Sequence, residues 1–238
     1  MKIMWTLQGA DDTAPIDAYL ATLVAKVQVL AFERLDPDEA ATLSQEGDDP
    51  PVVTREGSAL RAVWILDVAS REVAVELARD APGGQGVLEV REVFTPQDFG
   101  APPSDEPPPP APPRKPGTHR FIAFIRSDAR SESGALPSAE VSAAMDVYCE
   151  KLLAANIMIG GQGLKASARG TRVRRSAAQR FILDGPFTET KELVAGYMLL
   201  QVPSLDDAID EVRGWLQVHL DHIREPRTAI EVRRLLSA

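Results

Sequence analysis

The sequence predicts an α+β protein made of two similar halves. The same order of apolar strands and amphipathic helices occurs twice, once on each side of a proline-rich segment at residues 101–117. Each half also ends in an apolar strand that contains the tripeptide Glu-Val-Arg, at residues 89–91 and at residues 231–233. A repeated order of elements with a shared tripeptide at the same place is typical of an internal duplication.

The proline-rich segment reads APPSDEPPPPAPPRKPG. Proline lacks a backbone donor and fixes φ, so this run can form neither a helix interior nor a central strand. We expect a semi-rigid polyproline II spacer, which predicts one domain over residues 1–100 and another over residues 118–238. The alternative is that the run is a ligand for an aromatic-lined groove.

Hydrophobic periodicity and turn residues place the elements in each half. The expected helices cover residues 15–28, 71–78, 138–156 and 205–216. The expected strands cover residues 3–7, 29–32, 52–54, 62–68 and 88–93 in the first half, and residues 121–126, 157–159, 180–183, 197–202 and 230–235 in the second. We interpret the order in each half as β-α-β-β-α-β, the ferredoxin-like motif.

Two helices cover one face of such a half and leave the other face of its sheet open. A second sheet is the obvious cover. The predicted fold class is therefore α+β, with two ferredoxin-like halves pairing as an intramolecular dimeric α+β barrel. Further association into a homo-oligomer stays open.

The composition favours a soluble globular protein over a membrane or secreted one. Hydrophobic residues make up 44% of the chain and charged residues 26%, values typical of a soluble globular protein. No apolar run approaches the roughly 20 residues that span a bilayer, and the N-terminus lacks the pattern of a signal peptide. The single cysteine, Cys149, can form no internal disulfide. These features predict a cytoplasmic protein without membrane contact.

Charge is divided unevenly between the halves. Residues 1–100 hold 8 Lys and Arg against 18 Asp and Glu, whereas residues 118–238 hold 16 against 15. An acidic half repels phosphate backbones, which argues against direct binding of nucleic acid. A small-molecule ligand is the expected partner.

A dense run of charge follows the expected strand at residues 180–183. The chain reads DGPFTETKE over residues 184–192 and then enters a glycine-aromatic strand, VAGYMLLQV, at residues 194–202. This stretch of sequence resembles the signature of the DGPF group of YCII-related proteins. These are small bacterial domains with a ferredoxin-like fold that pair into dimeric α+β barrels. The tail at residues 86–100, GVLEVREVFTPQDFG, is similar to the tail of many DGPF proteins.

The resemblance implies a fold and leaves the reaction open, because most members are uncharacterised. The first half departs from the pattern, since it has only residues 54–58 where the second half has the DGPF loop. We therefore expect the second half to supply the chemistry and the first half to act as a lid or scaffold.

Asp184 is the leading candidate for an acid/base residue. It leaves a strand end into a turn that glycine and proline hold, which could fix its carboxylate for proton transfer. The alternative is that Asp184 caps its own turn through side-chain to backbone bonds.

Further along the same loop, Glu189 and Lys191 could orient a polar substrate. Alternatively, both side chains belong to a solvated loop and form only weak surface ion pairs.

Three other residues are candidates for substrate binding. Gly161 lies in a glycine run that could let backbone amides approach an anionic ligand, or that could simply form a flexible hairpin loop. Tyr197 and Gln201 share one face of their strand and would bring polar tips to a pocket.

His219 and His222 lie three residues apart, and His222 is the second acid/base candidate. Spacing of this kind could serve a metal or proton transfer, or it could mark a solvated helix end. No third ligand is apparent nearby, so we expect no metal site, and no cofactor fingerprint is present.

Three functions are compatible with these residues. The first is a cofactor-independent enzyme of the isomerase, lyase or hydrolase type, with Asp184 as acid/base. The second is a non-catalytic ligand-binding or regulatory module linked to transcription control, because DGPF-like domains also occur attached to sigma factors. The third is a structural barrel. Fold alone does not decide among them.

Overall fold

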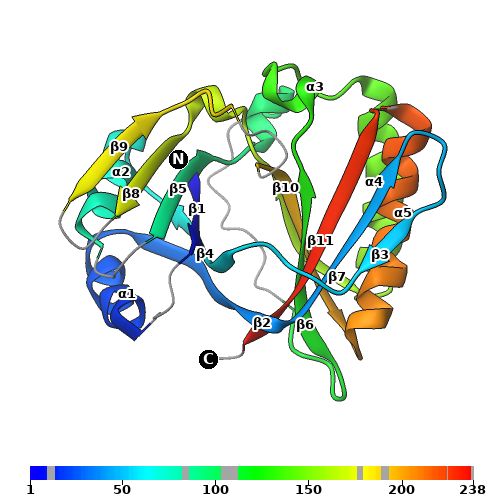
Figure 1. Cartoon of the computed structure of the whole chain (residues 1–238), viewed down its shortest axis with the longest axis horizontal. Helices are drawn as coiled ribbons and strands as arrows, with labels where there is room; N and C mark the ends of the chain where they lie inside the picture. The colour runs from blue at the N-terminus through cyan, green and yellow to red at the C-terminus, as the bar shows by residue number, and fades with distance from the viewer. Residues whose placement is uncertain are drawn as a thin grey trace.

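A computed structural model describes residues 1–9, 14–81, 86–102, 112–175, 179–188, 193–223 and 225–236. It is a mixed α+β protein with one large antiparallel sheet and five α-helices in the described part of the chain (Figure 1). The first half contains β1 (Lys2–Gln8), α1 (Ala14–Lys26), β2 (Gln28–Glu46), β3 (Val52–Thr54), β4 (Leu60–Asp67), α2 (Arg71–Asp80), β5 (Gly86–Glu92) and the 3₁₀ turn η1 (Pro96–Phe99).

The second half begins after the proline-rich segment, of which residues 103–111 lie outside the described residues. It contains β6 (His119–Arg126), α3 (Ala129–Glu132), α4 (Ala139–Ala154), β7 (Met158–Gly163), the 3₁₀ turn η2 (Ser167–Arg169), β8 (Thr171–Arg175), β9 (Arg180–Asp184), β10 (Val194–Val202), α5 (Leu205–His222) and β11 (Arg227–Leu236). In the described residues no helix is both long and apolar enough to cross a membrane.

The strands follow the order β7-β10-β6-β11-β2-β4-β1-β5-β8-β9, with β3 paired to β2. The strands of the first half thus lie as β2-β4-β1-β5. Four strands of the second half lie on one side of them as β7-β10-β6-β11, and its other two, β8 and β9, lie on the other side next to β5. A bridge between Val93 and Leu164 also joins the end of β5 to the end of β7. The two halves are therefore hydrogen-bonded to each other at β11–β2, at β5–β8 and at this bridge.

One strand is longer than the sequence predicts, and another is not predicted at all. The strand expected at residues 29–32 runs on to Glu46, and residues 171–175, expected as part of a glycine-rich loop, form β8. Each of these segments pairs with the last strand of the opposite half, β11 or β5. The partner is remote in sequence, so local pattern could not indicate it. The register of the β2–β11 ladder shifts between Leu35 and Ala40, around Pro37, as at a β-bulge.

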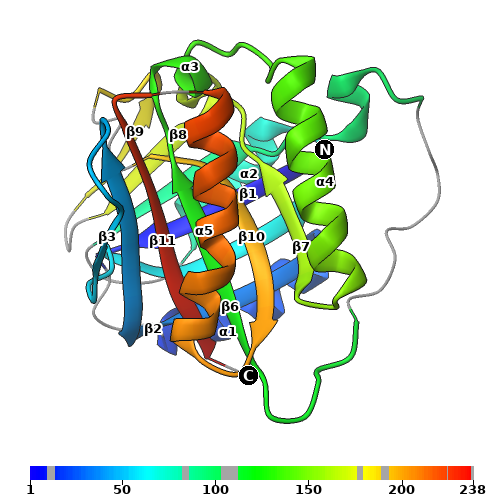
Figure 2. The same cartoon turned by 90° about the vertical axis from the view of Figure 1, so that its right-hand side faces the viewer.

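The helices are positioned by local signals that the sequence does show. Ser138 caps α4 by accepting a hydrogen bond from the backbone N–H of Val141, and Ser204 caps α5 in the same way with Asp207. α5 extends beyond the expected end to His222. Figure 2 shows α4 and α5 side by side over the strands of the second half.

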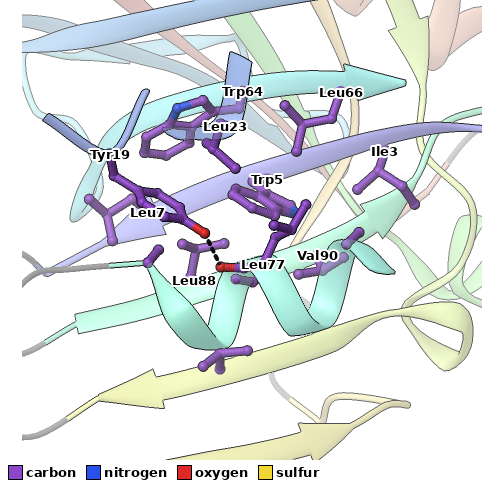
Figure 3. Packing of buried hydrophobic residues seen from close by; sticks show 14 of the residues in the cluster. Ile3, Trp5, Leu7, Tyr19, Leu23, Trp64, Leu66, Leu77, Leu88 and Val90 are labelled. Atoms are coloured by element: carbon purple, nitrogen blue, oxygen red, sulfur yellow. Dashed lines mark hydrogen bonds between the residues drawn. The ribbon is translucent and has the colours of Figure 1, made fainter. Parts of the chain in front are cut away.

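Three hydrophobic clusters fill the molecule. The first lies between the strands of the first half and its helices, where the Tyr19 hydroxyl donates to the Leu77 carbonyl oxygen at 2.8 Å and links α1 to α2 (Figure 3). The second packs α4 and α5 against the second half's strands. The third joins the two halves, and contains Met4, Ile65, Ile122, Phe124 and Tyr197 among others. The space between the two sets of strands is thus packed with side chains.

Candidate functional site

A cleft of about 870 Å³ lies beside helix α4. Its walls come from α4, the end of α5, strands β7 and β10, the segment 125–137 and the η1 tail of the first half. We call it the α4 cleft, and its lining includes Met145, Cys149, Trp215, Met158, Leu136, Phe94, Phe99, Asp128, Arg130, Gln162 and His219. Both halves therefore contribute to it, and most of its lining surface is apolar.

His219 lines this cleft, and a hydrogen bond to the backbone fixes which of its ring nitrogens carries the proton. Its Nδ1 lies 3.1 Å from the backbone carbonyl oxygen of Trp215, one helical turn earlier in α5. A carbonyl can only accept, so Nδ1 carries the proton and Nε2 is left as an acceptor in the neutral ring. Burial lowers the pKa of His219, although the Trp215 carbonyl and Asp128 oppose the shift. The ring is therefore neutral at pH 7.

Tyr197 and Gly161 line the cleft from the paired strands β10 and β7. The Tyr197 hydroxyl lies 3.2 Å from Oε1 of Gln162 and donates to it, and burial raises the pKa of Tyr197 to about 12. A Cβ at position 161 would lie 2.7 Å from the Tyr197 carbonyl oxygen, so glycine lets β7 and β10 approach here. Two of the predicted binding residues thus share the cleft with His219.

Asp184 lies outside both clefts described in this section. Its Oδ1 accepts a hydrogen bond from the Thr171 hydroxyl at 2.6 Å and lies 3.7 Å from the Arg71 guanidinium. The carboxylate side chain is 66% exposed. Thr171 lies opposite Asp184 in the β8–β9 ladder and Arg71 begins α2, so these contacts tie the end of β9 to β8 and α2. The turn-capping role and the acid/base role of Asp184 both remain predictions.

The rest of the Asp-Gly-Pro-Phe stretch packs onto η2. The Gly185–Pro186 peptide is cis, and a Cβ at Gly185 would lie 1.9 Å from the Ser167 carbonyl oxygen. Phe187 is buried, donates its backbone N–H to the Ser167 hydroxyl, and lies under the Arg172 guanidinium at 4.2 Å. Gly185 and Phe187 therefore have clear packing roles in the described structure.

The remaining candidates are placed elsewhere. Gln201 is buried at the far end of β10, where it accepts from the Lys115 N–H and donates to the Asn156 carbonyl. His222 Nδ1 lies 3.1 Å from Glu140 Oε1 and joins α5 to α4. Glu189 and Lys191 lie outside the described residues. Among the residues that the structure describes, no group of three His, Cys, Asp or Glu side chains could hold a metal ion.

A second cleft, of about 630 Å³, lies between the β2–β3 hairpin and the start of β11. It is lined by hydroxyl and charged groups, among them Ser58, Glu231 and Arg126. Glu231 accepts from Arg126, from Arg233 and from both the N–H and the hydroxyl of Ser58. Since these polar groups are engaged with one another, the α4 cleft is the better candidate for a ligand site.

Sequence reasoning missed much of the α4 cleft. Met145 and Cys149 of α4 line the cleft but were not among the candidate site residues. Cys149 is half-buried, and burial raises the pKa of its thiol. The contribution of Phe94 and Phe99 was not expected, because nothing local indicates that the first half's tail reaches α4.

Comparison with known proteins adds little to this description. No family model matches the chain. A stretch of 41 residues, 17% of the chain, is 46% identical to an uncharacterised protein of Rhizobium meliloti (strain 1021). The match spans only 33% of that protein's length.

Proposed function

We propose that the chain is a tandem YCII-related protein of the DGPF kind, in which two ferredoxin-like halves form an intramolecular dimeric α+β barrel. The strand order supports this. With β3, β8 and β9 set aside, each half has four strands, and in the sheet they lie in the order second, third, first, last: β2-β4-β1-β5 and β7-β10-β6-β11. So does the shared Glu-Val-Arg tripeptide, which forms a buried ion pair within each last strand, Glu89–Arg91 and Glu231–Arg233.

The function that the geometry supports best is binding of a small organic molecule, in the cytoplasm, at the α4 cleft. One observation carries this proposal: a cleft of about 870 Å³ with a mainly apolar lining and a neutral histidine in its wall. Small-molecule sites typically have volumes of roughly 300–1,000 Å³ with mostly apolar walls and a few polar groups that fix orientation. Here Nε2 of His219 offers an acceptor and the Arg130 guanidinium offers a cation.

A second candidate is an acid–base enzyme that uses the same cleft. The fixed tautomer of His219 favours it, because a neutral ring with Nδ1 bonded to a carbonyl presents Nε2 as a base. In this version His219 takes the role that the sequence suggested for Asp184, whose carboxylate is held by Thr171 and Arg71 instead.

A thermal-shift screen with small carboxylates, phosphates and aromatic lactones tests the binding proposal. A ligand at about 100 times its Kd stabilises the native state by about 2.7 kcal/mol, which raises the midpoint by about 5 °C or more for a chain of this size. Trp215 lines the cleft whereas Trp5 and Trp64 lie in the first half's core, so the same ligand should change tryptophan fluorescence. The change should be absent in Trp215→Phe.

The matched pair of variants is Ser142→Trp and Ala143→Trp. Both positions lie on α4, but only Ser142 lines the cleft. Ser142→Trp should fill the cleft and abolish the ligand shift, while Ala143→Trp should keep it. A ligand that stabilises both variants equally binds elsewhere and contradicts the proposal, and so does a complete lack of shifts across the screen. Turnover of a ligand found in this way would favour the enzyme.

A further inference from the structure

Strand β9 exposes an apolar edge of the sheet. It is the last strand in the order, and it pairs with β8 alone in the described structure. Its three central residues are large and apolar, and their exposed fractions are 55% for Phe181, 50% for Ile182 and 49% for Leu183. Figure 1 shows β9 at the outer end of the first half's side of the molecule.

An edge of this kind offers unpaired backbone N–H and C=O groups to another strand. Proteins usually protect such an edge with a central charge, a proline or a very short strand. β9 has five residues, with charges only at its ends, Arg180 and Asp184. β3, by comparison, has three residues, and Val53 within it packs against the core. The short length of β3 protects its edge, whereas β9 is longer and has no protecting charge or proline in its centre.

The sequence of β9, Arg-Phe-Ile-Leu-Asp, is complementary to itself in the antiparallel direction. If two copies align with Ile182 opposite Ile182, each Arg180 meets an Asp184, and each Phe181 meets a Leu183 on the same face. Both charge pairs then have opposite signs and both apolar pairs are matched. A two-fold axis through Ile182 generates this arrangement and closes it at two copies.

The environment of Arg180 agrees with an anion arriving from outside. Arg180 lies opposite Arg175 in the β8–β9 ladder. Burial, and then the charge of Arg180, lower the pKa of Arg175. A carboxylate from a second copy would offset the repulsion between these two cations.

We propose that β9 pairs antiparallel with β9 of a second copy of this chain, centred on Ile182, so that the protein forms a symmetric dimer with a continuous sheet. This dimer is independent of the α4 cleft. β7 forms a wall of the cleft, and β9 lies at the opposite end of the strand order from β7.

The first test is the mass of the full chain in solution, by analytical ultracentrifugation over a range of concentrations. The wild type should dimerise. Ile182→Lys places two like charges opposite each other on the axis, and should raise the dimer Kd about tenfold or more. Val147→Lys is the matched control, since Val147 is an exposed β-branched residue on α4. Its Kd should equal that of the wild type.

Cross-linking tests the register. In a Cys149→Ser background, Ile182→Cys brings two thiols opposite each other and should give a disulfide-linked dimer on mild oxidation, whereas Arg180→Cys should not, because its Cα atoms lie too far apart across the axis. Dimerisation that survives Ile182→Lys overturns the proposal, as does a wild-type monomer at every concentration. Equal cross-linking from positions 180 and 182 also overturns it, because the register would then be different.

Discussion

Arg91 and Arg233 make the same contacts in the two halves of the chain. Arg91 donates through Nε to the Lys165 carbonyl oxygen at 3.1 Å, and Arg233 donates through Nε to the Asp36 carbonyl oxygen at 3.2 Å. Each guanidinium also binds the glutamate two residues earlier in its own strand. Each arginine thus ties the last strand of one half to a segment of the other half, at nearly full burial.

Loss of either arginine should be costly, because it leaves a buried carboxylate with one cation fewer. We expect Arg91→Ala and Arg233→Ala each to lower the free energy of unfolding by about 3 kcal/mol or more. Arg213→Ala, which removes an exposed pair with Asp210, should change it by less than about 1 kcal/mol. Urea denaturation measures all three. Equal, small losses in the three variants would show that Arg91 and Arg233 do not hold the halves together.

The glycine of the Asp-Gly-Pro-Phe turn should tolerate no side chain. A Cβ at Gly185 would lie 1.9 Å from the Ser167 carbonyl oxygen, which forces η2 away from the turn. We expect Gly185→Ala to destabilise by about 2–3 kcal/mol. Gly160→Ala is the control, because its Cβ would meet only Leu199 Cδ1 at 3.8 Å, an ordinary contact. Equal thermal midpoints of the two variants would contradict this account of the turn.

The carboxylate of Asp184 should matter for stability and not for the α4 cleft. Asp184→Ala removes the hydrogen bond from Thr171, at a cost of about 1 kcal/mol. The shift caused by any ligand of the cleft should be unchanged. A double-mutant cycle with Thr171→Val isolates the contact, and a coupling energy near zero would argue against it. Loss of the ligand shift in Asp184→Ala alone would return Asp184 to the binding site.

His219 should make stability depend on pH in the weakly acidic range. Burial lowers its pKa below the ordinary value of 6.5, so the unfolded chain takes up the proton at a higher pH than the native protein does. The free energy of unfolding should therefore fall as the pH decreases from 6.5 towards the native pKa. His219→Asn keeps a donor near the Trp215 carbonyl but does not titrate, so its stability should fall less over this range. Parallel pH profiles of the two proteins would show that His219 titrates normally.

The elements near one another in sequence were predictable because their signals are local. Apolar periodicity predicted a helix over residues 138–156, and the structure has α4 over Ala139–Ala154. Alternation in β10 separated Met198, which faces the helices, from Tyr197, which faces the space between the halves, although the sequence could not say which face was which. For the site, Tyr197, Gly161 and His219 were among the candidates because polar or small residues stand out in apolar elements. Asp184 stood out for the same reason, but it lies outside the cleft and is bonded to Thr171.

The sequence by itself determined the α+β class, most of the helices and the inner strands, since periodicity and caps depend on neighbours along the chain. Tertiary structure alone decided that residues 40–46 and 171–175 are strands, because their hydrogen-bonding partners are β11 and β5 of the opposite half. It also decided where the α4 cleft lies, because Phe94 and Phe99 reach it from the first half while His219 reaches it from α5. Contacts between residues far apart in the chain leave no periodic signal, and only the packed chain brings them together.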